Sequence, residues 1–337
     1  MRAIVCRQYG EPELLELADV PVPQIGDHEL LVAIKGAGLN LADLVFLKGS
    51  YQGQAKAPFI PGIEVFGEVT AVGARVAGFQ PGDRVIGQVP AGGYAEYVAM
   101  NPRTTIRVTI DIPTAEAAGL YANYGTAYSA LVQRANARAG ETVLILGAAG
   151  GVGLAAVQIA KALGLRVIAD CRGAAKQTLA RDQGADLITD YQAADFRDQV
   201  LQFTDGRGCD IVLDMIGDQA SKAALRVVAF CGRFVVIGFA SGQPHAFPGN
   251  HLLVKNASVI GHWWGDYGTR DRAQLDAAFE HLFAMYGAGQ IRPLVSDVLS
   301  LEQVPTGLRR YADRKVLSKL VALPSLSPDH PSSLATS

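Results

Sequence analysis

Glycines at the start of a helical stretch give the strongest chemical signal in the sequence. Gly150, Gly151 and Gly153 follow the apolar stretch 143–146 and open the helical stretch 152–164. Residues without a Cβ let a phosphate approach closely, and a helix N-terminus supplies N–H groups and partial positive charge. Ala148 occupies the first glycine position of the G-x-G-x-x-G pattern. Strand, turn, helix and next strand together still predict a dinucleotide site.

The charges after the next strand disagree about which dinucleotide binds. Asp170 ends that strand, where an acid selects the ribose hydroxyls of NAD, although it comes one residue before the usual position, here Cys171. Arg172 and Lys176 follow it, and with Tyr191 they would suit the 2′-phosphate of NADP. We favour NADPH over NADH, although the acid Asp170 argues for NADH. Lys176 would alternatively be a solvated residue in the first turn of a helix, with no role in binding.

Two different patterns of apolar residues along the chain predict two domains. Residues 1 to about 120 alternate short apolar runs with Gly/Pro turns, as in 29–40, 67–87 and 92–100, which is typical of a Greek-key β domain. From about 120, continuous apolar strands alternate with amphipathic helices, which predicts a parallel, doubly wound sheet.

Composition excludes several classes of protein. The 337 residues are 49% hydrophobic and 18% charged, with a formal charge of −2, so nothing favours nucleic-acid binding. No apolar run approaches ~20 residues, and the start lacks the apolar core of a signal peptide, so we expect neither a membrane span nor export. The four cysteines are far apart, which suggests free thiols in a reducing, cytoplasmic compartment.

Motifs along nearly the whole chain resemble one family. They include "GLNLADLVFLKGSY", "PFIPGIEVFGEV", "GGYAEYV", "YGTAYSAL", "AAGGVG", "DMIG" and "GRFVVIGFASG". In this order they resemble the medium-chain dehydrogenase/reductase superfamily, in its zinc-free quinone oxidoreductase (zeta-crystallin-like) branch. The resemblance implies an α/β protein with a GroES-like Greek-key β domain over 1–122, completed by 265–325. A Rossmann domain with a doubly wound parallel sheet would span 123–264, and 326–337 would be a flexible tail.

The resemblance also implies the cofactor-binding residues. It places Lys176 and Tyr191 on the 2′-phosphate of NADPH, and the family usually carries Thr where Asp170 stands. The full implied set is Thr126, Gly150, Gly151, Val152, Asp170, Arg172, Lys176, Tyr191, Gly238, Phe239 and Ser241.

The same resemblance predicts a site without metal. Zinc-dependent relatives carry Cys where Asn40 lies, His where Ile63 lies and Cys near Tyr121, and all three ligands are absent. Catalytic zinc needs three converging protein ligands, which Glu64 and Asp43 alone cannot provide. The six histidines form no ligand cluster, so we expect no zinc.

Hydride transfer to a quinone or an α,β-unsaturated carbonyl is the expected reaction. Without a Lewis acid, an acceptor that delocalises the incoming charge is the easiest to reduce. The candidate catalytic residues are Asn40, Asp43, Tyr51 and Tyr124. For each there is an alternative: a turn residue for Asn40, a helix cap for Asp43 and cleft-lining or core aromatics for the tyrosines.

The same sequence leaves two alternative functions open and also predicts an oligomer. An enoyl-thioester reductase fits the same scaffold, and a non-catalytic crystallin-like or RNA-binding protein is a further alternative. The stretch 252–264 follows the strand in "GRFVVIGF" and would form an exposed sheet edge. In the family that these motifs resemble, such edges pair across a two-fold axis, so we expect a homodimer, or a dimer of dimers.

Overall fold

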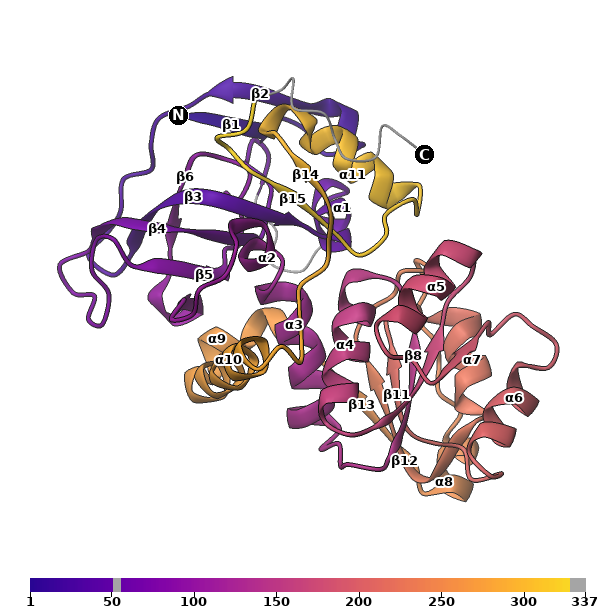
Figure 1. The fold of residues 1–337 in the computed structure, drawn as a ribbon. Helices are drawn as coiled ribbons and strands as arrows, with labels where there is room; N and C mark the ends of the chain where they lie inside the picture. Colours follow the sequence, from indigo (N-terminus) through magenta and orange to yellow (C-terminus); the bar gives the residue numbers. More distant parts are fainter. Residues whose placement is uncertain (51–55, 328–337) are drawn as a thin grey trace. The chain divides into compact units, whose positions relative to one another are not determined.

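The computed structural model describes residues 1–50 and 56–327, which divide into two compact units (Figure 1). Unit 1 comprises 1–122, 265–283 and the chain from 293 onward, and unit 2 comprises 123–264 and 284–292. The segment 284–292, expected in the β domain, is part of unit 2. Its last residue, Arg292, explains why, because its N–H donates to Gln158 Oε1 of unit 2 (2.9 Å). The expected tail lies largely outside the described residues.

Unit 1 is built on a seven-stranded, mainly antiparallel sheet. Its strand order is β14-β15-β3-β4-β5-β7, with β6 also paired to β3, and β1 and β2 form a separate hairpin. Only β14 and β15 pair in parallel. Its strands are β1 (Arg2–Cys6), β2 (Leu15–Asp19), β3 (Leu30–Leu39), β4 (Glu64–Val72), β5 (Arg84–Gln88), β6 (Tyr97–Met100), β7 (Thr105–Arg107), β14 (Val295–Leu299) and β15 (Lys319–Ala322). Its helices are α1 (Leu41–Leu47), α2 (Thr114–Ala118), α9 (Tyr267–Arg270), α11 (Val304–Ala312) and most of α10 (Arg272–Gly287), whose residues 284–287 belong to unit 2.

Unit 2 is a six-stranded sheet in which every pair is parallel. Its order, β10-β9-β8-β11-β12-β13, means that the chain runs outward from β8 on one side and then returns to fill the other. Its strands are β8 (Thr142–Leu146), β9 (Arg166–Asp170), β10 (Leu187–Thr189), β11 (Cys209–Asp214), β12 (Val228–Val236) and β13 (Ser258–Gly261); its helices are α4 (Gly151–Ala162), α5 (Ala174–Asp182), α6 (Phe196–Phe203), α7 (Asp218–Leu225) and α8 (Gly249–Lys255), while α3 (Tyr121–Tyr128) begins at its boundary with unit 1.

The order of the sheet in unit 2 determines where a ligand can bind. Open α/β sheets bind ligands beyond the carboxyl ends of the strands, at the point where the strand order reverses. Here that point lies at β8, whose residues are all buried and whose carboxyl end runs into the glycine turn. The predicted fold class, with a doubly wound parallel sheet in the second unit, is confirmed. Among the described helices, none is long and apolar enough to cross a membrane.

Candidate functional site

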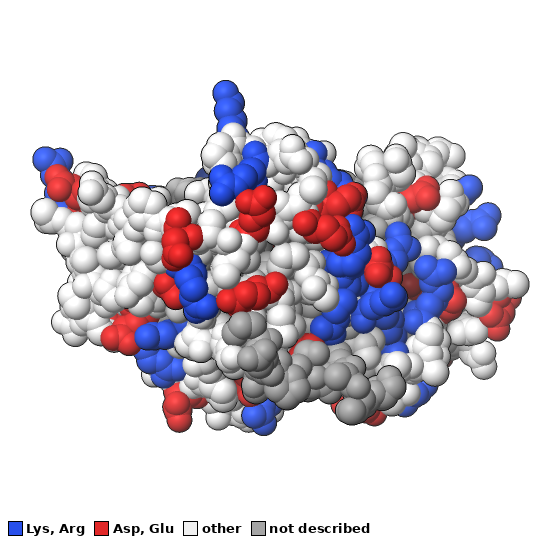
Figure 2. All heavy atoms as spheres, turned by 90° about the horizontal axis from the view of Figure 1, so that it is seen from above, with Lys and Arg blue, Asp and Glu red and all other residues white. Residues whose placement is uncertain are grey.

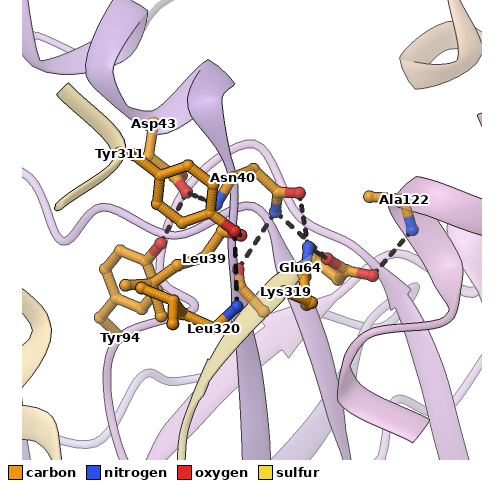
Figure 3. A network of polar contacts seen from close by, with 10 residues as sticks. Leu39, Asn40, Asp43, Glu64, Tyr94, Ala122, Tyr311, Lys319 and Leu320 are labelled. Atoms are coloured by element: carbon orange, nitrogen blue, oxygen red, sulfur yellow. Dashed lines mark hydrogen bonds and ion pairs between the residues drawn. The ribbon is translucent and has the colours of Figure 1, made fainter. Parts of the chain in front are cut away.

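A buried ion pair lies at the centre of a polar network in unit 1 (Figure 3). Lys319 Nζ donates to Glu64 Oε2 and to Asn40 Oδ1, each at 2.6 Å. The Asn40 amide group donates to the same carboxylate and to the Gly38 carbonyl, each at 3.1 Å. Glu64 Oε1 accepts the N–H of Ala122 at 2.7 Å. Both charged side chains are almost fully buried, so each depends on the other for compensation.

Strand pairing brings these distant residues together. β15 runs antiparallel to β3 with Leu320 opposite Leu39, which sets Lys319 beside the end of β3. Gly38 provides the space, because a Cβ there would overlap the Glu64 carboxylate and come within 2.7 Å of the Lys319 side chain. The network therefore depends on pairing between chain segments more than 250 residues apart.

Asp43 extends the network from helix α1. Its Oδ2 accepts the hydroxyl of Tyr94 at 2.6 Å and the N–H of Asn40 at 2.7 Å, and Tyr311 donates to the nearby Leu39 carbonyl at 3.0 Å. Asp43 is fully buried, and burial raises its pKa to about 6 against the lowering effect of these hydrogen bonds. Its Oδ1 has no hydrogen-bond partner among the described residues. A carboxyl so enclosed acts by holding the start of α1.

The geometry limits what the four candidate catalytic residues can do. Both N–H groups of the Asn40 amide are used inside the network, so the amide is held in place rather than free to donate. The Tyr124 hydroxyl is buried in unit 2, where it lies 2.8 Å from Gln158 Oε1 and 2.7 Å from the Arg292 carbonyl. That hydroxyl ties 284–292 to unit 2. Tyr51 lies outside the described residues.

The glycine turn of unit 2 begins at Gly147. Gly147 has φ +75°, a left-handed conformation that favours glycine, and it directly precedes Ala148. α4 begins at Gly151 after the cap residue Gly150, and Val152 lies half-buried in its first turn. The first N–H groups of a helix have no intrahelical acceptor, so this terminus can bind a diphosphate.

Gly153 is required for packing, whereas Gly150 has more space. A Cβ on Gly153 would overlap the Gly147 carbonyl and lie 2.7 Å from Ala148 atoms, but one on Gly150 would meet only that carbonyl, at 3.4 Å. We expect Gly153→Ala to lower the free energy of unfolding by ~1–3 kcal/mol through overpacking, measured by urea denaturation without ligand. Gly150→Ala is the control, and an equally large loss in it would contradict this explanation.

Arg172 and Tyr191 lie together in unit 2, and Lys176 lies on the helix that follows Arg172. The Arg172 guanidinium lies over the Tyr191 ring, 5.8 Å from its centroid, and donates to Gln192 Oε1 at 2.6 Å. Lys176 lies in the first turn of α5, where its charge acts on the neighbouring Cys171 thiol. The Arg172–Tyr191 pair offers a planar cation and a phenol, which are donors suited to a phosphate.

The third segment with predicted cofactor-binding residues is the loop that follows β12. Gly238 donates its N–H to the Asp214 carbonyl, and Ser241 donates its N–H to the Ile216 carbonyl. Phe239 is 49% exposed, which makes it the most accessible aromatic of this loop. Thr126 lies apart in sequence, half-buried in α3.

Comparisons with known proteins agree with this architecture. Residues 26–127 match the alcohol dehydrogenase GroES-like domain family, and residues 151–282 match the zinc-binding dehydrogenase family. A quinone oxidoreductase-like protein 2 homolog of Nematostella vectensis is 33% identical over 323 residues, covering 95% of this chain and 88% of that protein. Human quinone oxidoreductase is 31% identical over 306 residues, covering 90% and 92%. A mycobacterial structure complexed with NADPH has a TM-score of 0.90 at 31% identity, covering 96% and 100%.

The chain therefore belongs to the medium-chain dehydrogenase/reductase superfamily, in its quinone oxidoreductase-like branch. It is an oxidoreductase of that type, as the sequence motifs predicted.

Proposed function

We propose that this protein is a zinc-independent reductase that uses NADPH to reduce a quinone or an α,β-unsaturated carbonyl. The observation that carries the cofactor assignment is the Arg172 guanidinium on the Tyr191 ring, joined to the glycine turn through Asp170, which accepts N–H groups from Gly147, Ala148 and Tyr191. The relative crystallised with NADPH supports the same choice. NADH is the alternative.

The residues of unit 2 fit this dinucleotide. The N-terminus of α4, which begins at Gly151 after Gly150, offers N–H groups to a diphosphate. NADPH supplies the hydride when bound. Arg172, Lys176 and Tyr191 would hold its 2′-phosphate. Gly238, Phe239, Ser241 and Thr126 would contact the rest of the dinucleotide.

The polar network supports a reaction without zinc. The Glu64 carboxylate is already neutralised by the Lys319 ammonium at 2.6 Å, and that ammonium also occupies Asn40 Oδ1. Zinc favours converging His, Cys and carboxylate ligands, and no group of three such side chains was found among residues 1–50 and 56–327. Asn40 and Asp43 then shape the site: Lys319 and Glu64 fix the amide, and Asp43 fixes the backbone of α1.

A panel of acceptors tests the substrate class. Quinones and enones should oxidise NADPH rapidly because they delocalise the incoming charge, and simple ketones and aldehydes should react far more slowly. The loss of reduced nicotinamide absorbance measures each rate. Enoyl-thioesters that outpace every quinone would favour the enoyl-thioester reductase instead.

We also propose that the protein is a homodimer that pairs through unit 2. β13 ends the sheet, and near it Leu253 and Val254 of α8 are 76% and 73% exposed, with Phe230 69% exposed on β12. Apolar side chains exposed beside a sheet edge are typical of an interface.

Val254→Asp should therefore shift the protein towards monomer, because dimerisation would bury the new charge. Sedimentation velocity over a range of concentrations measures the change. Val22→Asp changes a 43% exposed valine of unit 1 and should leave the dimer intact. A wild type that is monomeric at every concentration would contradict the assembly.

A cytoplasmic location completes the proposal. All four cysteines are free thiols, and Cys6, Cys171 and Cys209 are buried, which suits a reducing compartment.

A further inference from the structure

Asp170 is buried inside unit 2 rather than exposed at its surface. It ends β9 and is 3% exposed, with Thr189 of β10 and Leu146 of β8 as its strand partners. A carboxylate that binds ribose hydroxyls must face the ligand. In the structure this carboxylate is enclosed by its neighbours, and the position that usually carries the acid is filled by the buried Cys171 thiol.

The main-chain carbonyl and the side-chain carboxylate of Asp170 each hold a different loop. Its carbonyl oxygen accepts the N–H groups of Gly147 (3.1 Å) and Ala148 (3.0 Å), which form the glycine turn. Its carboxylate Oδ2 accepts the N–H of Tyr191 at 2.6 Å. One residue thus joins the turn for the diphosphate to the loop that carries Tyr191.

The Tyr191 loop supports the exposed cation. The Tyr191 ring lies beneath the Arg172 guanidinium, and Gln192 accepts a hydrogen bond from Arg172 at 2.6 Å. Fixing the Tyr191 backbone therefore fixes both contacts of Arg172. Figure 2 shows several Lys and Arg side chains gathered right of centre on the face that it presents.

We propose that Asp170 is a positioning residue for NADPH: its carboxylate holds the Tyr191 backbone, and through it the Arg172–Tyr191 pair that binds the 2′-phosphate. The proposal rests on the proposed use of NADPH. An acid in this strand usually binds the ribose hydroxyls of NAD, whereas Asp170 would support binding of the 2′-phosphate of NADPH.

Ionisation of Asp170 strengthens its hold on the Tyr191 loop. Burial, with a smaller contribution from Asp190, raises the pKa of Asp170 to about 7 against the lowering effect of the Tyr191 N–H, Arg172 and Thr189. Because the hydrogen bond from Tyr191 favours the anion, the charged carboxylate is the better acceptor for this loop.

Comparing Asp170→Ala with Asp170→Asn tests the proposal. Neither variant carries the charge, and only Asn keeps an acceptor oxygen for the Tyr191 N–H. Titration of protein fluorescence gives the Kd for NADPH, NADH and the fragments 2′,5′-ADP and 5′-ADP. We expect the Ala variant to bind NADPH and 2′,5′-ADP roughly fivefold or more weakly than the Asn variant, with NADH and 5′-ADP within about twofold. Asp190→Asn removes a neighbouring charge, leaves the Tyr191 contact intact and serves as the matched control.

The outcomes separate this proposal from the proposed function. Equal NADPH affinity in the Ala and Asn variants overturns the positioning role while leaving NADPH as the cofactor. A wild type that prefers NADH, or binds 5′-ADP as well as 2′,5′-ADP, overturns the cofactor assignment and the positioning role with it. If the Ala variant does not fold, Asp170→Asn decides: retained affinity for both NADPH and NADH supports an acceptor that holds the Tyr191 N–H, and a large loss of NADH affinity overturns the positioning role because Asp170 then holds the ribose.

Discussion

Lys319→Met should lower the free energy of unfolding by ~3–5 kcal/mol, because it leaves the Glu64 carboxylate buried without its counter-ion. Lys319 is 2% exposed and Glu64 is 1% exposed, so water cannot replace the lost ammonium. Urea denaturation measures the change. Activity should fall as well, since Asn40 loses the donor to its Oδ1.

Two further variants isolate the effect of the pair. Adding Glu64→Gln to Lys319→Met should restore part of the lost stability, because Gln is neutral and can still accept the Ala122 N–H. Lys315→Met removes a lysine whose side chain is 72% exposed and whose ion pair with Asp313 is on the surface, so little should change. A Lys319→Met protein as stable as the wild type would show that the ion pair contributes nothing.

Lys176→Ala should weaken NADPH binding by roughly tenfold or more and leave NADH binding nearly unchanged. A charge-assisted hydrogen bond contributes ~1.5–3 kcal/mol, and only NADPH carries the phosphate that would receive it. Arg172→Ala should act in the same direction through its contact with the phosphate. Isothermal titration with each dinucleotide measures both affinities.

The control for this pair of variants is Lys222→Ala in α7. Lys222 is an exposed lysine in the last turn of that helix, so its removal changes the net charge of unit 2 by the same amount. Equal losses for NADPH and NADH in Lys176→Ala would mean that Lys176 stabilises the fold or the diphosphate rather than selecting the 2′-phosphate.

Local patterns were enough to predict the parallel sheet and its turn. Strands buried on both faces read as continuous apolar runs, and the glycines follow such a run directly, so both signals lie within a few residues. Because such strands are buried on both faces, their sequences do not show which way each side chain points. In β9 four of five residues are buried, so alternation of polar and apolar residues cannot say that the Asp170 side chain points inward. The G-x-G-x-x-G pattern also does not include Gly147, the glycine with φ +75° just before it.

The polar network could not be predicted because it depends on long-range pairing. Lys319 begins a short strand near the end of the chain, and it meets Glu64 across 255 residues only through the register of β15 on β3. The sequence alone favours a surface lysine there. Tyr94, which donates to Asp43, was part of a quoted motif, but nothing local indicates its partner.

The most direct test of the proposed function is the rate of quinone reduction by metal-stripped protein with each cofactor. The protein is treated with a chelator, its metal content is checked by elemental analysis, and kcat/KM is measured with NADPH and with NADH. A zinc-independent reductase that uses NADPH should keep full activity after chelation and show a clear preference for NADPH. Stoichiometric zinc whose removal abolishes activity, or a preference for NADH, would contradict it.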